Sequence, residues 1–96
     1  MEITKLLAYA LESGASDLHL SVGSIPMVRI NGVMKPLNMD MTSDGDMESI
    51  LPQVMNDDQI QNFRDIKEID FSSQLDGKGR FRVNFFHQIR GIAAVF

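Results

Sequence analysis

The stretch Gly79–Phe96, GRFRVNFFHQIRGIAAVF, predicts two β-strands that meet at a turn near His87 and Gln88. In the first strand apolar and polar residues alternate, so the two kinds of side chain lie on opposite faces. The apolar set is Phe81, Val83 and Phe85, and the polar set is Arg80, Arg82 and Asn84. The second strand, residues 91–96, is almost entirely apolar, which is typical of a strand covered on both faces.

The sequence stops inside this second strand, with no turn residue and no polar tail after it. Chain ends are usually solvated, so an apolar strand is an unusual place to stop. We therefore expect these 96 residues to be the front part of a longer protein.

The bulk properties are those of one ordinary globular domain. A chain of 96 residues with 44% hydrophobic and 23% charged residues can bury a single modest core. The absence of cysteine excludes disulfides and thiolate metal sites. The sequence also shows no long apolar run and no basic start followed by an apolar stretch, which argues against a spanning helix and a signal peptide. The cytoplasm is the expected location.

Charge is distributed unevenly along the chain. The net charge of −4 argues against nucleic acid as the main partner, because phosphate backbones are bound by basic surfaces. Acidic residues crowd positions 40–70, whereas residues 77–96 contain basic residues and no acidic one. One end of the domain is therefore expected to present a local positive surface.

Apolar spacing and capping residues predict three helices. The first covers Glu2–Ser13, and Gly14 is a suitable stop because glycine adopts the left-handed conformation without strain. The second begins after Ser43, and Pro52 is expected to kink it or to end it early. The third begins after Asn56, which has a glutamine three residues later, as in a capping box.

Short alternating segments predict further strands. They are expected at residues 17–21, 27–30, 33–37 and 69–75. Asn31–Gly32 suits a type I′ hairpin turn, and another turn is expected at residues 76–79. Because the strands follow one another through tight turns, the order of elements favours an α+β fold with one antiparallel sheet and helices packed on one face.

The chain shows no complete catalytic or metal site. The turn Asp76–Gly79 lacks the GxxxxGK[ST] spacing of a phosphate-binding loop. His19 and His87 lack the further ligands of a zinc site, although Asp17 and His19 share a strand face on which a hydrogen bond is conceivable. No serine lies in a nucleophile elbow. We therefore expect no catalytic and no metal-binding residue in this chain.

Three arginines have the clearest binding chemistry. Arg80 and Arg82 lie two apart on one strand, so both project from the same face, about 7 Å apart. Neighbouring guanidinium groups suit a phosphate or carboxylate ligand. Arg90 is a third candidate. The alternative is a solvated sheet face or ion pairs with the acidic helices, since structural ion pairs are common.

Two segments are distinctive in their order and in their spacing from the N-terminus. They are GASDLHLS at residues 14–21 and GRFRVN at residues 79–84. Further matching segments are Ile3–Leu7, Pro26–Gly32, Met55–Asp57, Ile69–Ser72, Arg90–Gly91 and Ala94–Phe96. Together they resemble, over nearly the whole chain, the N-terminal domain of the type IV pilus retraction ATPases, which belong to the type II/IV secretion ATPase superfamily. A retraction ATPase is favoured over assembly or secretion ATPases, because the domain starts at residue 1.

The resemblance implies a PAS-like α+β domain followed by a RecA-like domain with the Walker A and B motifs, which this sequence lacks. It implies a homohexameric ring in which each N-terminal domain packs on the RecA-like domain of the neighbouring subunit. ATP and Mg²⁺ are the implied cofactors of the full-length protein. The implied outer partner is the inner-membrane pilus machinery, which places the protein in the cytoplasm at that membrane. The chain by itself is not expected to hydrolyse ATP.

The resemblance also assigns a role to one arginine. Arg82, in FRVN, matches a family arginine that reaches the nucleotide phosphates at the domain junction, and a second family arginine would follow directly after Phe96. Arg80 and Arg90 are further candidates for this contact, with ring-interface or structural roles as the alternative. An arginine on a movable domain stabilises phosphate charge only when the domain closes, so ATP binding and hydrolysis can drive domain rotation.

A free-standing PAS-like domain that senses a small ligand or binds another protein is the alternative function. Ligand sensing requires a cavity with convergent polar groups. The apolar alternation of the strands predicts a filled core instead.

Overall fold

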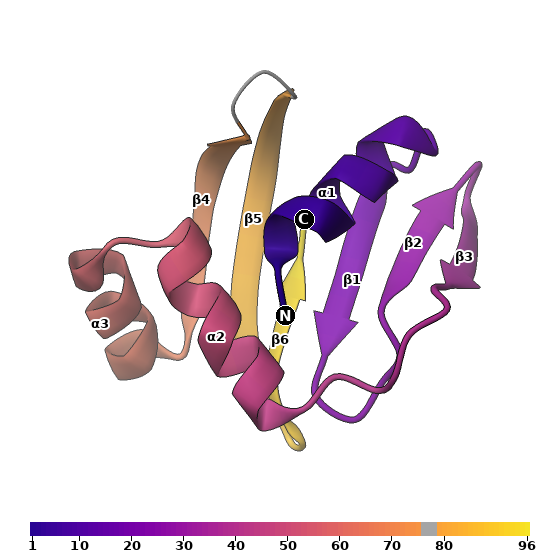
Figure 1. Ribbon diagram of the computed structural model, residues 1–96. Helices are drawn as coiled ribbons and strands as arrows, with labels where there is room; N and C mark the ends of the chain where they lie inside the picture. The colour runs from indigo at the N-terminus through magenta and orange to yellow at the C-terminus, as the bar shows by residue number, and fades with distance from the viewer. Residues whose placement is uncertain (76–78) are drawn as a thin grey trace.

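The computed structural model describes residues 1–75 and 79–96, and within them it contains three helices and six strands (Figure 1). The helices are α1 (Ile3–Glu12), α2 (Asp44–Val54) and α3 (Asp57–Ile66). The strands are β1 (Asp17–Ser21), β2 (Met27–Ile30), β3 (Val33–Pro36), β4 (Glu68–Leu75), β5 (Gly79–Gln88) and β6 (Gly91–Val95). Most of the turn predicted at residues 76–79 lies outside the described residues.

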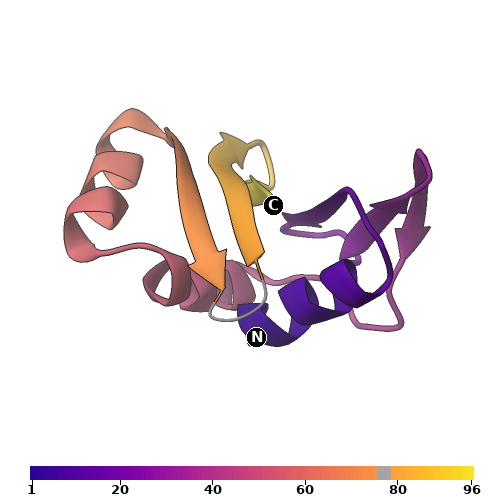
Figure 2. The same ribbon diagram turned by 90° about the horizontal axis from the view of Figure 1, so that it is seen from above.

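These strands form one antiparallel sheet in the order β3-β2-β1-β6-β5-β4. The last strand, β6, lies in the middle and pairs with β1 on one side and β5 on the other. Helices α1 and α2 cover one face of the sheet, and α3 lies beside β4 (Figure 2). The predicted α+β fold with one antiparallel sheet is confirmed.

The core lies between the sheet and the helices. The three apolar residues predicted to share one face of β5 lie against this core, where Val83 and Phe85 are fully buried and Phe81 is partly buried. Phe63 of α3 meets Phe85 edge to face, with ring centroids 5.9 Å apart. In β6, Ala94 faces this core and Ala93 on the other face is also buried, as predicted for a strand covered on both faces.

Local capping signals place the helices as predicted. Ser43 and Asn56 each form a complete capping box at the start of α2 and α3. Gly14 follows α1 with a φ of 73°, the left-handed conformation expected of a glycine stop. Pro52 lies in the last turn of α2, which ends two residues later at Val54.

Of two predicted turns, one is confirmed and the position of the other is wrong. Asn31 and Gly32 both have positive φ, as the predicted type I′ turn requires. The last turn was predicted near His87 and Gln88, but β5 continues to Gln88 and the chain turns at residues 89–90. The ring of His87 stacks on the Phe63 ring at a centroid distance of 5.1 Å. This contact favours the strand conformation at His87.

Candidate functional site

Arg82 lies on the sheet face opposite the helices and is held by a carboxylate from the neighbouring strand. Its Nε donates to Oδ1 of Asp70 at 3.2 Å, and its Nη2 donates to Oδ2 at 3.0 Å. Arg82 pairs with Ser72 across β4 and β5, so Asp70 is its diagonal neighbour on the same face. The guanidinium therefore has a defined orientation although the Arg82 side chain is 83% exposed.

The hydrogen bonds from Arg82 lower the pKa of Asp70 below its ordinary value, so this carboxyl is ionised at neutral pH. Because both side chains are exposed to water, the attraction between them is screened and the pair is weak. The sequence allowed for ion pairs between the arginines and the acidic helices, but Arg82 takes its carboxylate from a strand instead.

The other two candidate arginines lie at different places. Arg80 is exposed, lies opposite Gln74, and projects from the same face as Arg82, as predicted. Arg90 lies in the turn at the far end of β5, and six residues of strand between Arg82 and the turn correspond to about 20 Å. Its Nη1 donates to the carbonyl of Gly23 at 3.3 Å, so Arg90 joins this turn to the loop after β1. The structure thus groups Arg80 with Arg82 and separates Arg90 from them.

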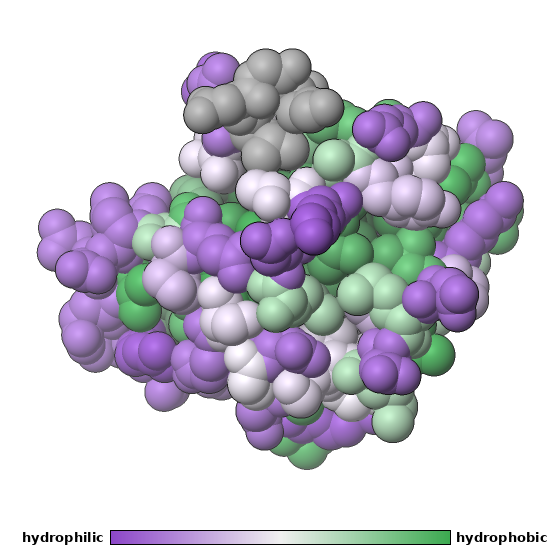
Figure 3. Space-filling model, in the orientation of Figure 1, coloured by the Kyte–Doolittle hydropathy of each residue, from purple (hydrophilic) through white to green (hydrophobic). Residues whose placement is uncertain are grey.

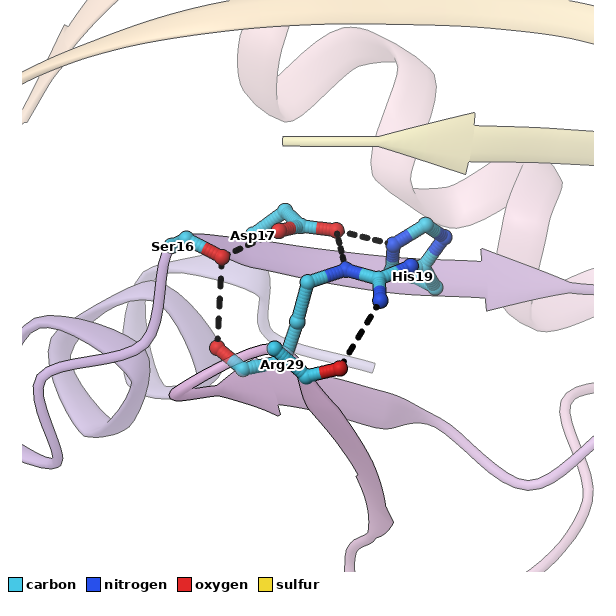
Figure 4. Close-up of polar contacts among 5 residues, drawn as sticks. Ser16, Asp17, His19 and Arg29 are labelled. Carbon is cyan, nitrogen blue, oxygen red and sulfur yellow. Dashed lines mark hydrogen bonds and ion pairs between the residues drawn. The ribbon is translucent and has the colours of Figure 1, made fainter.

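A second polar cluster lies on β1 and β2 (Figure 4). The Asp17–His19 hydrogen bond conceived from the sequence is present. Ser16 Oγ donates to Oδ1 of Asp17 at 2.5 Å, and Arg29 Nε donates to Oδ2 at 3.3 Å. Burial acts to raise the pKa of Asp17, but the hydrogen bonds from these three residues outweigh it and lower the pKa. Sequence reasoning missed Arg29, because only the strand register places it opposite Asp17.

This second cluster has the residue types of a catalytic triad without its geometry. Ser16 donates to Asp17 and not to His19, whereas nucleophilic catalysis requires a hydroxyl against the imidazole. Arg29 also donates to the carbonyl of Gly32 at 3.3 Å, which ties the cluster to the hairpin turn. The hydrogen bonds of this cluster hold β1 and β2 together.

Two adjoining grooves run along α1 on the helix-covered face, where apolar surface is visible beside the helix (Figure 3). The first, about 580 Å³, is lined by Met1, Glu2, Lys5, Leu6, Met39, Asp40, Met41 and Asp46. The second, about 440 Å³, is lined by Leu6, Tyr9, Pro36, Leu37, Asn38 and Met39. Both are open to solvent, and both reach the packed core at one buried residue, Leu6.

Neither a metal site nor a spanning helix is found among the residues that the structure describes. Among these residues, no three acidic or histidine side chains are arranged to hold a metal ion. None of the helices formed by residues 1–75 and 79–96 is long and apolar enough to cross a membrane.

Comparison with known proteins identifies the relatives of the chain. No protein-family model matches the sequence. Over all 96 residues, however, the sequence is 44% identical to the type IV pilus retraction ATPase PilT of Pseudomonas aeruginosa. The chain is homologous to the N-terminal region of the PilT and PilU pilus ATPases. The resemblance found in the sequence is therefore confirmed.

PilU of the same organism is 35% identical over 88 residues, which are 92% of this chain. The chain spans only 28% of the length of PilT and 23% of PilU. Among solved structures, the pilus retraction motor PilT with bound ADP matches with a TM-score of 0.88 and 35% identity. That match covers 99% of this chain and 28% of the PilT chain, so this chain corresponds to one part of the motor.

Proposed function

We propose that this chain is the N-terminal domain of a hexameric, ATP-driven motor that retracts type IV pili in twitching motility. The observation that carries the proposal is the alignment with PilT over the whole chain, which the match to the PilT structure supports. Hydrolysis is assigned to a RecA-like domain outside the matched region, because the sequence contains no GxxxxGK[ST] motif. The domain itself contributes an arginine and a moving surface.

Arg82 is the residue proposed to contact the nucleotide phosphates. Its guanidinium is exposed, oriented and placed beside Arg80, which adds positive charge to the same face. An arginine fork matches the oxygens of a phosphate group, and its charge favours the closed arrangement of the two domains. ATP supplies the negative charge at this junction when it is bound. Mg²⁺ is assigned to the RecA-like domain, since the described residues offer no cluster of ligands.

The remaining parts of the proposal are those that the resemblance found in the sequence implies. The partners are the RecA-like domain of a neighbouring subunit in a homohexamer and the inner-membrane pilus machinery. The proposed location is the cytoplasmic side of the inner membrane. The fold is assigned to the PAS-like class, which agrees with its antiparallel sheet and its helix-covered face.

The test uses the full-length subunit that carries this domain. Arg82→Ala is expected to reduce ATP turnover about a hundredfold, the loss seen when a charge-stabilising donor is removed from an active site. Arg64→Ala removes an arginine that also holds a carboxylate but lies on α3, and it should leave turnover unchanged. The 96-residue chain alone should show no turnover. Normal turnover in Arg82→Ala, or turnover by the chain alone, would contradict these roles.

The ligand-sensing alternative has less support. The two grooves along α1 are open surface features, and the core between sheet and helices is filled by fully buried side chains. A protein-interaction role is compatible with the motor, because a groove with methionines and acidic residues on its border can accept a partner segment.

A further inference from the structure

We propose that Asp70 is a positioning residue that holds Arg82 at rest and releases it when a nucleotide phosphate arrives, so that Asp70 lowers the affinity of the motor for ATP. This inference rests on the proposed contact between Arg82 and the phosphates. It assigns a function to a carboxylate that has no other evident role on the open face of the sheet.

Asp70 and a phosphate require the same donors of Arg82. A guanidinium has five N–H groups, and its bidentate edges suit the paired oxygens of carboxylates and phosphates. Asp70 occupies one such edge, through Nε and Nη2 of Arg82. A phosphate that approaches this edge must therefore displace the carboxylate.

The negative charge of Asp70 also disfavours a bound phosphate. Asp70 is ionised, because the hydrogen bonds from Arg82 lower its pKa, and its side chain is 46% exposed next to the arginine. An anionic nucleotide that binds Arg82 meets this negative charge at close range, and like charges repel. Asp70 therefore opposes the contact between a phosphate and Arg82 even when the phosphate approaches another edge of the guanidinium, and this effect is lost when Arg82 is replaced.

A phosphate can replace Asp70 at Arg82 at little cost in free energy. The pair is exposed on both sides, so water can replace either partner and the attraction that must be broken is small. The backbones of β4 and β5 are already paired on both sides of Asp70 and Arg82. The side chains can therefore separate without any change in the sheet, and Arg82 can be released without local unfolding.

The experiment measures steady-state ATP hydrolysis by the full-length subunit at low salt. Asp70→Asn keeps the shape of the side chain and removes its charge, and we expect the KM for MgATP to fall about two- to fivefold, as for loss of one exposed ion pair. The kcat should not rise by the same factor as the KM falls. Asp70→Glu can reform the pair and should restore a KM close to that of the unmodified protein. Glu48→Gln removes a similar ion pair on the helices and should leave the KM unchanged.

A double variant separates a path through Arg82 from a general structural effect. If Asp70 acts only on Arg82, adding Asp70→Asn to Arg82→Ala should produce no further change in KM. Thermal unfolding of each variant establishes that its fold is kept. If Asp70→Asn does not fold, Asp70→Ser takes its place with the same expectation.

The outcomes distinguish this inference from the proposed function. An unchanged or raised KM in Asp70→Asn, while Arg82→Ala is impaired, overturns the inference and leaves the phosphate contact of Arg82 standing. Additive effects in the double variant also overturn the inference. An unimpaired Arg82→Ala overturns the proposed phosphate contact itself, and the inference with it.

Discussion

Two arginines of this domain make similar ion pairs in different surroundings. Arg64 of α3 donates to Glu48 of α2 at 3.1 and 3.0 Å, and Arg82 of β5 donates to Asp70 of β4 at 3.2 and 3.0 Å. Helices satisfy their backbone groups internally, so apart from the short connection through Met55 and Asn56, α2 and α3 contact each other through side chains. The two strands, by contrast, are already joined along their length by a backbone ladder.

This difference shows which arginine the fold can release. The Arg64 pair adds a side-chain link between α2 and α3, which have no backbone ladder between them. This link lies next to the stacked rings of Phe63 and His87. The Arg82 pair repeats a link that the backbone already makes. An arginine whose ion pair contributes little to the fold is available for a ligand, and this supports a binding role for Arg82 and a structural role for Arg64.

The largest expected effect is on the free energy of unfolding, and it should differ between the neighbouring residues Phe63 and Arg64. Phe63 is fully buried against Phe85, and Phe63→Ala should lower the free energy of unfolding by about 3–5 kcal/mol because it leaves a cavity. Urea denaturation measures this loss. Arg64→Ala is the matched control and should cost much less. Equal losses would contradict this ranking, because the ion pair would then stabilise the fold as much as the aromatic contact does.

An intermediate effect compares the two carboxylates directly. Glu48→Gln should lower the midpoint of thermal unfolding by roughly 2 °C, because it weakens the link between α2 and α3. Asp70→Asn should lower it by less than about 1 °C, because the strand ladder remains. Differential scanning calorimetry at neutral pH measures both midpoints. A larger decrease for Asp70→Asn would contradict the distinction between the two pairs.

The smallest expected effect is a change in titration. Arg82 lowers the pKa of Asp70 in the folded state below the ordinary value of 3.8. The stabilisation from this pair is therefore present above pH 3.8 and is lost as the pH falls through the folded pKa. Arg82→Ala should raise the pKa of Asp70 toward 3.8, as followed by NMR of its carboxyl carbon. Glu48 serves as the control and should keep the lowered pKa that Arg64 gives it. An unchanged titration of Asp70 would show that its pair with Arg82 is absent in solution.

Features that depend on neighbouring residues could be predicted from the sequence. The capping boxes at Ser43 and Asn56 each need only residues three positions apart, and both are present. The Asn31–Gly32 turn and the inward face of β5 also follow from short-range rules. The location of Arg82 on the opposite face follows from the same alternation.

Features that depend on strand register could not be predicted. Asp70 and Arg82 meet because β4 and β5 pair in one particular register, and Asp17 meets Arg29 for the same reason. The position of the last turn was missed because His87 is kept in the strand by a ring on α3, a contact between distant parts of the chain. The sequence could therefore name Arg82 as a candidate, but not the carboxylate that holds it.

The central position of β6 has a consequence for folding. Of the six strands, β6 is synthesised last, yet it lies between the half-sheet β3-β2-β1 and the hairpin β4–β5. Until β6 pairs with both, the edges of β1 and β5 are open and can pair with other chains. Bringing these segments together closes a long loop of chain, which is slow compared with forming local hairpins. The domain is therefore expected to fold late, in one cooperative step, and a nascent chain that stalls before Gly91 should aggregate.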